Sequence, residues 1–412
     1  MVLKHIKREL YLNKIEEFID TDFIKVLTGI RRCGKTSIMF DIIDELKSGG
    51  INEENILFIS FEDIKYNTIE DFKELNKIIT DKVKDIDGKI YFFFDEIQNV
   101  SQWERSINAF RVSFDCDIFI STSYSKLLSS ELSTLLAGRF IEIKIYPFSF
   151  KEYLQYTEEI KGITLNKYKE IELFEEEYIK FGGMPGLLEI NDEQNKKDVL
   201  SGLYNTILID DILSGFKISR IDLFQRFTGY MMNSVGQTFS AKSIRNYLKN
   251  RNIRTSDDTL LKYLNFLQLP YFLLKCRRQD LIGKKEMQIY EKYYLTDHGF
   301  HHAIVEDNYN KITGILENIV YIELLRRGFT VKVGKIYDKE IDFVCEKSGV
   351  YTYIQVSYKI FDEKTQKREF SPLLQINDKF DTYVITMDYM NRVVEGVKQI
   401  SVIDFLKGDE IS

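Results

Sequence analysis

Apolar and polar positions along the first third of the chain predict alternating strands and helices. An apolar run at residues 23–28 leads into a glycine-bounded loop and then into a helical pattern that ends near residue 46. Residues 90–94 form a second, fully apolar strand, and residues 115–123 form the next one. Fully apolar strands are typical of the centre of a parallel sheet, which is buried on both faces. We therefore expect an α/β domain with a parallel sheet at residues 1–150.

The middle of the chain is predicted to be helical and to end in a hairpin. Residues from about 150 to 215 carry helical patterns, broken by the glycine-rich turn FGGMPG at residues 181–186. Two amphipathic helices follow at residues 239–250 and 254–268, and two strand-like runs then flank a turn at Gly283. Helix, turn, helix and hairpin is the order of elements in a winged helix.

The C-terminal part predicts a second α/β domain with the order αβββαβ. Its predicted elements are a helix at 312–327, strands at 330–336, 340–344 and 351–360, a helix at 366–376 and a strand at 381–387. This order is similar to the core of the restriction-endonuclease-like PD-(D/E)xK nucleases.

Composition narrows the class of protein. The chain is 44% hydrophobic and 29% charged, as in ordinary globular proteins. Its four cysteines lie far apart, without the close pairs of a zinc site, which favours a reducing compartment. The start of the chain lacks the apolar core of a signal peptide, and no stretch approaches 18 apolar residues. We therefore expect a cytoplasmic protein that does not contact a membrane.

A candidate phosphate-binding loop follows the first predicted strand. Residues 29–36 match the pattern G-x-x-x-x-G-K-[ST], between a strand and a helix that presents its positive end to the same phosphates. Lys35 is expected to reach the β and γ phosphates of ATP, and Thr36 to offer its hydroxyl to Mg²⁺. A plain glycine-rich turn is the alternative. The residues expected to bind ATP are Gly29, Ile30, Arg31, Arg32, Cys33, Gly34, Lys35, Thr36 and Ser37.

Candidate catalytic residues follow the next two strands. Asp95 is expected to hold Mg²⁺ through water, and Glu96 to polarise the attacking water. Arg139 is expected to follow a helix in "SSELSTLLAGRF", where it would be an arginine finger or sensor, or else a surface residue. The later strand ends in hydroxyl groups that could sense the γ-phosphate, those of Ser121, Thr122, Ser123 and Tyr124.

These segments resemble a family of bacterial and archaeal P-loop ATPases related to AAA+ proteins, which couple an N-terminal ATPase to a C-terminal domain of poorly defined function. The matching pieces span nearly the whole chain and include "IKREL", "TGIRRCGKTS", "FFFDEIQ", "PFSFKEYL", "FGGMPG", "KYYLTDHG", "LENIVYIELLRRGF", "EIDFV" and "IQVS". In such proteins the strand after the acid pair usually ends T-G-S-N, whereas this chain has Tyr124 at the position of the asparagine. The resemblance implies ATP binding and leaves open whether hydrolysis is efficient.

A chain of 412 residues exceeds what one hydrophobic core usually organises. We predict four domains. They are a P-loop AAA+-like ATPase domain at residues 1–150, a helical lid at 151–215, a winged-helix domain at 216–305 and a restriction-endonuclease-like domain at 306–412.

Positive charge is concentrated in the predicted winged helix. The chain carries a net charge of −7, yet residues 241–285 contain 11 Lys and Arg against three Asp and Glu. Such cations bind nucleic-acid phosphates by releasing counterions, without reading base sequence. The alternatives are that this domain contacts other domains or proteins, or that its charges are simply solvated. The predicted nucleic-acid contacts are Arg251, Arg254, Lys275, Arg277, Arg278, Lys284 and Lys285.

The C-terminal domain carries the remains of a nuclease motif. Glu317, Asp342 and Gln355 would surround Mg²⁺ in a working site, with a lysine two residues beyond the glutamine. That position is Ser357 here, and Lys359 lies too far along the same strand face to replace the amine fully. We therefore favour a degenerate fold that binds nucleic acid or protein over an active nuclease.

The histidines of "DHGFHHA" invite a metal hypothesis, but no acid or cysteine lies at a matching spacing. A helix cap or an exposed cluster is the favoured interpretation.

The leading hypothesis is an ATP-dependent molecular switch that uses Mg²⁺ and contacts nucleic acid, with DNA favoured, through its C-terminal domains. Two alternatives remain, an ATP-gated metal-dependent nuclease and a non-hydrolysing scaffold that binds ATP as a structural ligand. A protein partner or self-association is possible, because Arg139 would act either within one chain or across a subunit boundary.

Overall fold

The chain folds into two compact units. The computed structural model describes residues 5–124, 136, 138–216, 218–283, 285–305, 312–408 and 411. Unit 1 contains Met1–Ile145 together with Leu269–Tyr271, and unit 2 contains Tyr146–Gln268 and Phe272–Ser412.

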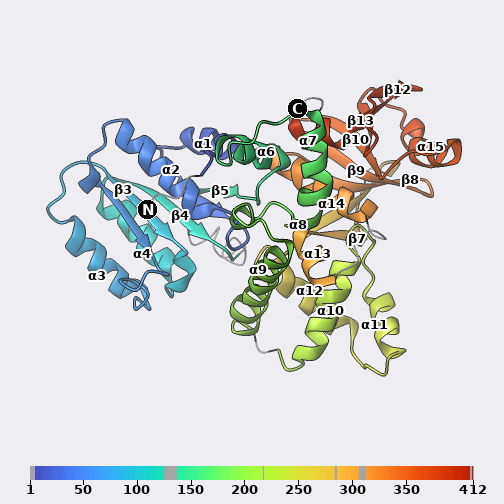
Figure 1. The fold of residues 1–412 in the computed structure, drawn as a ribbon. Helices are drawn as coiled ribbons and strands as arrows, with labels where there is room; N and C mark the ends of the chain where they lie inside the picture. Colours follow the sequence, from blue (N-terminus) through green and yellow to red (C-terminus); the bar gives the residue numbers. More distant parts are fainter. Residues whose placement is uncertain are drawn as a thin grey trace. The chain divides into compact units, whose positions relative to one another are not determined.

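Unit 1 is built on a five-stranded parallel sheet with the order β2-β3-β4-β1-β5 (Figure 1). The strands are β1 (Ile24–Thr28), β2 (Ile56–Ser60), β3 (Ile90–Asp95), β4 (Cys116–Thr122) and β5 (Phe140–Lys144). Because β1, β3 and β4 run in the same direction and lie next to one another, their carboxyl ends meet at one edge. The predicted parallel sheet is confirmed.

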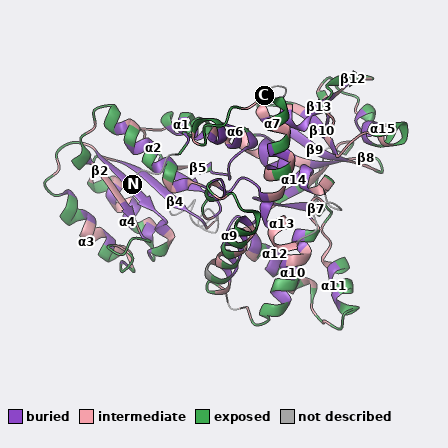
Figure 2. Ribbon diagram, in the orientation of Figure 1, coloured by how far each residue is buried: buried purple, intermediate pink, exposed green. Residues whose placement is uncertain are grey.

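The helices of unit 1 bury both faces of this sheet. Those that the structure describes are α1 (Glu9–Glu16), α2 (Lys35–Ser48), α3 (Phe72–Val83) and α4 (Trp103–Ser113), with short 3-10 turns at Glu53–Asn55 and Ile97–Asn99. Apolar side chains of α3 and α4 join those of the strands in one core, in which Phe92, Phe94 and Phe110 lie against one another. All residues of β1 and β3 are buried, Lys25 among them, and so are all but the first residue of β4 (Figure 2).

Unit 2 begins with the predicted helical segment. Its elements are α6 (Phe150–Glu159), α7 (Lys167–Glu172), a π-helix at Leu173–Tyr178, α8 (Ile179–Phe181), a 3-10 turn at Pro185–Leu187, α9 (Glu193–Thr206) and a π-helix at Ile207–Leu213. The FGGMPG segment is the turn between α8 and the 3-10 turn, as predicted.

A buried carboxylate holds this glycine-rich turn. Asp297 accepts hydrogen bonds from the backbone N–H groups of Gly183 (2.9 Å) and Gly299 (2.8 Å). Burial raises the pKa of Asp297 to about 6, although these hydrogen bonds counteract the effect. The side chain of Asp297 therefore connects the DHG segment to the FGGMPG turn.

Of the two interpretations of the histidine cluster, the exposed cluster is wrong, whereas the helix cap stays a prediction. His298 and His301 are buried, and a ring nitrogen of His298 lies 2.6 Å from the carbonyl oxygen of Tyr178. Burial lowers the pKa of His298 to about 4. The backbone contact of Asp297 draws the start of this helix into the core, a constraint that sequence spacing does not reveal.

The next elements appear in the predicted order of helices and hairpin. They are α10 (Ile221–Asn233), α11 (Ala241–Lys249), α12 (Asp257–Gln268), β6 (Leu273–Asp280) and β7 (Lys285–Leu295). The hairpin does not stand alone, because β6 also pairs in parallel with β8 (Thr330–Ile336), with Arg277 opposite Lys332. One sheet therefore crosses the predicted boundary at residues 305 and 306, and the four-domain division itself stays a prediction.

That sheet has eight strands with the order β12-β13-β11-β10-β9-β8-β6-β7. The remaining elements are α13 (Gly299–Val305), α14 (Ile312–Arg326), β9 (Lys339–Lys347), β10 (Val350–Ser357), α15 (Glu363–Phe370), a 3-10 turn at Leu373–Gln375, β11 (Asp381–Thr386), β12 (Arg392–Val394), β13 (Val397–Ser401) and α16 (Val402–Lys407). The predicted αβββαβ order is present, and the last two strands and α16 extend it. Among the helices that the structure describes, none combines the length and the apolar character that a membrane span requires.

Candidate functional site

The glycine-bounded loop joins the carboxyl end of β1 to the start of α2. Gly29 and Gly34 have φ angles of 149° and 102°, in a region that side chains disfavour. A Cβ atom on Gly29 would lie 2.2 Å from the carbonyl oxygen of Ile145. The tight path of the loop therefore requires glycine at residue 29, and it brings the N-terminus of a 14-residue helix to the sheet edge.

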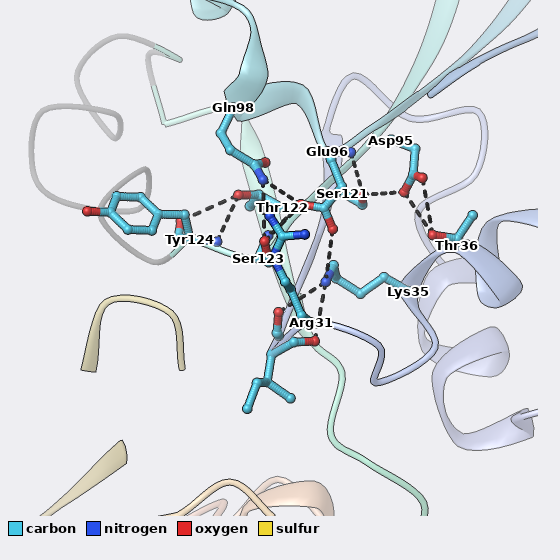
Figure 3. Close-up of polar contacts among 12 residues, drawn as sticks. Arg31, Lys35, Thr36, Asp95, Glu96, Gln98, Ser121, Thr122, Ser123 and Tyr124 are labelled. Atoms are coloured by element: carbon cyan, nitrogen blue, oxygen red, sulfur yellow. Dashed lines mark hydrogen bonds and ion pairs between the residues drawn. The ribbon is translucent and has the colours of Figure 1, made fainter. Parts of the chain in front are cut away.

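Lys35 is buried and its ammonium lies inside this loop (Figure 3). Its Nζ donates to the carbonyl oxygens of Gly29 (3.1 Å) and Ile30 (3.4 Å), and lies 3.2 Å from Oε1 of Glu96. Burial alone would lower the pKa of Lys35, but its neighbours, with Glu96 foremost, together outweigh burial and raise the pKa. Lys35 therefore remains a cation at the centre of the site.

Asp95 gathers hydroxyl groups from three elements around its carboxylate. It accepts hydrogen bonds from Ser121 (2.6 Å), Thr36 (3.0 Å) and Ser60 (3.2 Å), which lie on β4, α2 and β2. Burial raises the pKa of Asp95, and the charge of Glu96 adds to the effect, although the hydrogen bonds oppose it. Thr36 and Asp95 together form a cluster of oxygen atoms of the kind that Mg²⁺ prefers.

The carboxylate of Glu96 is held in place by neighbouring side chains. It has a left-handed backbone with φ of 52°, and its Oε2 accepts hydrogen bonds from Ser123 Oγ (2.9 Å) and from the side-chain amide of Gln98. Burial alone would raise the pKa of Glu96, but Lys35, Gln98 and Ser123 lower it below its ordinary value. The carboxylate is therefore ionised and fixed in direction.

Tyr124 does not fill the place of the missing asparagine. Its ring points away from Glu96 and Lys35 (Figure 3), while its backbone N–H bonds to the hydroxyl of Thr122 at 3.1 Å. The amide beside Glu96 comes instead from Gln98, which our sequence analysis missed. The sequence places Gln98 two residues after Glu96, in "FFFDEIQ", but does not show that its amide turns back onto the carboxylate.

The other predicted loop residues differ in exposure. Cys33 is fully buried and burial raises the pKa of its thiol, whereas Arg32 and Ser37 are exposed. Arg31 donates to Glu62 at 3.1 Å. Arg8 was missed by the sequence analysis: its side chain is buried and donates to the carbonyl oxygen of Cys33 at 3.0 Å. The loop is therefore also braced by the segment "IKREL".

Arg139 lies at the end of the sheet where β1 begins, whereas the loop follows the end of β1. It precedes Phe140, which pairs with Ile24 at the start of β1, whereas the loop follows Thr28 at the end of that strand. The strand separates them by about 13 Å, at about 3.3 Å per residue. The side chain is 59% exposed and lies 3.8 Å from Asp22. A role at the nucleotide of its own chain does not fit this position. The predicted helix before Arg139 falls largely outside the described residues.

In unit 2 the predicted C-terminal site is partly assembled. Glu317 and Asp342 both contact the ammonium of Lys292, at 2.8 and 3.5 Å, and Oε1 of Gln355 accepts from the N–H of Asp342 at 3.4 Å. Burial and the neighbouring Glu317 raise the pKa of Asp342 to about 8. Among the described residues no group of three or more acids, histidines and cysteines is arranged to hold a metal ion. Lys292 was missed by the sequence analysis.

The residues at the two lysine positions of the nuclease motif do not supply an amine to these acids. Ser357 is buried, and Lys359 places its ammonium 5.2 Å from the ring of Tyr358. The amine comes from β7 instead.

Several of the predicted nucleic-acid contacts are engaged in ion pairs within the chain. Lys275 pairs with Glu291 at 2.6 Å and Arg277 with Glu286 at 3.0 Å. Arg278 pairs with Glu340 at 2.9 Å and its side chain is only 11% exposed, so its predicted contact with DNA does not fit.

The structure describes only two of the remaining predicted contacts in full. Arg251 and Arg254 are exposed after α11, and Arg251 lies 4.2 Å from the ring centre of Tyr247. Lys284 and the side chain of Lys285 lie outside the described residues.

Comparison with known proteins identifies related chains. Residues 21–154 match the family model of the AAA domain, and residues 173–330 match a domain of unknown function (DUF8612). A Haemophilus influenzae protein, described only as uncharacterized, is 38% identical over 403 residues, which cover 97% of this chain and 98% of that protein. Uncharacterized protein MJ1544 of Methanocaldococcus jannaschii is 30% identical over 414 residues, which cover 98% of this chain and 90% of that protein.

Two solved structures match this chain distantly. The Aeropyrum pernix ORC1 protein, solved in complex with DNA, is 10% identical, with 74% of this chain and 94% of that chain covered and a TM-score of 0.36. A DNA polymerase III γ subunit-related protein of Thermotoga maritima is 14% identical, with coverage of 62% and 83% and a TM-score of 0.29. The family model identifies residues 21–154 as an AAA domain of the P-loop type. Because the matches to the two whole proteins are nearly full-length, this chain belongs to the family of the Haemophilus influenzae and Methanocaldococcus jannaschii proteins.

Proposed function

We propose that the protein binds ATP with Mg²⁺ and hydrolyses it. One observation carries the proposal: Lys35, Thr36, Asp95 and Glu96 converge at the carboxyl edge of a parallel sheet, beside the N-terminus of α2. Anionic ligands bind at such an edge because helix N-termini and backbone N–H groups present positive charge there.

The residues present fit Mg²⁺ and a nucleoside triphosphate. Lys35 offers a buried ammonium to the phosphates, and the loop from Gly29 to Gly34 has the conformation of a backbone cradle. Thr36 and Asp95 would hold the metal ion through their oxygen atoms. Bound Mg²⁺ would supply positive charge that neutralises the phosphate oxygens.

Glu96 is the group that would take the proton from the attacking water. Its carboxylate is ionised, and Gln98 and Ser123 fix its direction. When Lys35 turns to a phosphate, Glu96 loses one of its partners and gains freedom to accept a proton. The outward direction of the Tyr124 ring supports hydrolysis over a scaffold that only binds ATP, because the tyrosine does not cover the carboxylate (Figure 3).

Replacing Lys35 with alanine tests the binding part of the proposal. A charge-assisted contact to phosphate contributes about 2 kcal/mol, so we expect ATP affinity to fall ~30-fold. Titration with a fluorescent ATP analogue measures the change. Lys47→Ala is the matched control, because this lysine lies in the last turn of α2 and pairs with Glu53. Equal affinities in the two variants would refute the assignment.

We further propose that unit 2 contacts nucleic acid, with DNA favoured. The observation that supports this is the exposed pair Arg251 and Arg254 between α11 and α12, with Arg251 stacked on Tyr247. Arginine on an aromatic ring suits both phosphates and bases.

If Arg139 acts as an arginine finger, it does so in a second copy of the chain, because the phosphate-binding loop of its own chain lies at the other end of the strands.

The double variant Arg251→Ala/Arg254→Ala tests the contact with DNA. We expect the affinity for DNA to fall about fivefold. The slope of the logarithm of the binding constant against the logarithm of the salt concentration should fall by about 2, one unit for each lost phosphate contact. Fluorescence anisotropy at several salt concentrations measures both. Lys73→Ala/Lys77→Ala on α3 removes the same charge from exposed positions and should change neither. A slope that both double variants leave unaltered would argue against this contact.

A further inference from the structure

Lys292 on β7 carries a buried ammonium in the middle of the acidic cluster of unit 2. Its Nζ lies 2.8 Å from Glu317, 2.8 Å from Glu340 and 3.5 Å from Asp342, and its side chain is only 4% exposed. An ammonium has three hydrogens, and here it has three carboxylate neighbours. Lysine is rarely buried unless its charge is balanced in this way.

The remaining carboxylate oxygens are also largely engaged by the protein. Oε2 of Glu340 pairs with Arg278 at 2.9 Å, and Oδ2 of Asp342 accepts from the N–H of Val356 at 2.9 Å. The hydroxyl of Tyr294 donates to the same Glu317 oxygen that contacts Lys292. At least five of the six oxygens of these three acids thus contact a protein donor.

We propose that Lys292 occupies the position that a divalent cation would take between these acids, so that the nuclease-like part of unit 2 is closed to metal-dependent cleavage. A hard cation needs free oxygens and uncompensated negative charge. Here two cations, Lys292 and Arg278, already balance the negative charge of the cluster.

The adjoining cavity supports this assignment. It has a volume of about 410 Å³, and Glu317, Glu340, Asp342 and Gln355 line it. Lys292 is not part of its wall, because its side chain is only 4% exposed and its ammonium is enclosed between the three acids. A catalytic amine would have to face that cavity to orient a water molecule or stabilise a phosphate. The position of Lys292 therefore fits a resident counter-ion.

The proposal also explains Ser357. This residue stands on β10 where the nuclease motif has its lysine, and it is buried. Lysines at both Ser357 and position 292 would leave an excess of buried positive charge beside the same acids. The amine contributed by β7 replaces both the motif lysine and the metal ion in neutralising the cluster.

Mn²⁺ titration of the full chain tests this proposal. All proteins carry Asp95→Asn, so that the nucleotide site does not contribute a metal ligand. We expect Lys292→Met, which keeps the length of the side chain and removes its charge, to bind one Mn²⁺ at least ~10-fold more tightly than the protein with Lys292 intact. Adding Asp342→Asn should abolish the gain, and Lys292→Arg, which retains a cation, should show none. Calorimetry or the electron paramagnetic resonance of free Mn²⁺ measures the affinities.

Thermal unfolding gives a second readout in case Lys292→Met is unstable. Its uncompensated acids should lower its melting temperature, and Mn²⁺ should raise that temperature again, whereas the protein with Lys292 intact should respond to neither Mn²⁺ nor Mg²⁺ at this site. Two results would overturn the proposal. One is Mn²⁺ binding or DNA cleavage that requires Asp342 while Lys292 is present. The other is a Lys292→Met protein that neither binds nor is stabilised by Mn²⁺.

Discussion

Replacing Glu96 with glutamine is expected to lower kcat for ATP hydrolysis about 10³-fold and to leave ATP affinity unchanged or slightly higher. Glutamine keeps the size of the side chain and can still accept from Ser123, but it cannot take a proton from water. A general base typically raises the rate of a reaction by about 10²- to 10⁴-fold. Affinity should be retained because the loop, Lys35 and Thr36 remain intact, and Lys35 loses the carboxylate that competes with phosphate for it.

Phosphate release under steady-state conditions and titration with a fluorescent ATP analogue measure the two quantities separately. Glu54→Gln is the control, since Glu54 is an exposed glutamate outside the site. Comparable turnover by Glu96→Gln and the unmodified protein would remove Glu96 from the mechanism. If the unmodified protein binds ATP but releases no phosphate, the chain is the non-hydrolysing scaffold.

The convergence of the candidate nucleotide-site residues could be predicted because these residues are close in sequence. The loop at residues 29–36 contains its own glycines, lysine and threonine, and the strand before it and the helix after it follow from simple hydrophobic patterns. Asp95 and Glu96 could be added because the carboxyl ends of parallel strands share one edge. Gln98 needed a geometric fact that no pattern supplies, namely that the turn after Glu96 folds its amide back onto the carboxylate.

The C-terminal cluster could not be predicted in the same way. Lys292 lies 25 residues before Glu317 in the chain, and an amine can reach a site from any strand that borders it. Its strand was expected to belong to a separate hairpin, whereas β6 joins β8 and makes that hairpin the end of the larger sheet. Strand partners of this kind depend on tertiary packing, and not on the period of hydrophobic residues that identifies a strand.

Gly183→Ala is expected to lower the free energy of unfolding of unit 2 by about 3 kcal/mol, or ~150-fold in the equilibrium constant. A Cβ atom at residue 183 would lie 2.0 Å from the carbonyl oxygen of Phe148, a backbone atom that cannot move aside without breaking other contacts. The backbone of Gly183 also bonds to Phe148 (2.7 Å) and to Asp297 (2.9 Å), so displacement loses both hydrogen bonds.

Gly186→Ala supplies the control within the same FGGMPG turn. Gly186 is exposed, a Cβ atom there would meet nothing within 4 Å, and its φ is not positive, so we expect a change within about 0.5 kcal/mol. Urea unfolding followed by circular dichroism measures both variants, and equal slopes against urea would show that the same surface unfolds. Similar stabilities for the two variants would mean that the turn yields without cost. The glycines of this turn would then need an explanation other than the close approach of Phe148, such as freedom of the backbone to change conformation.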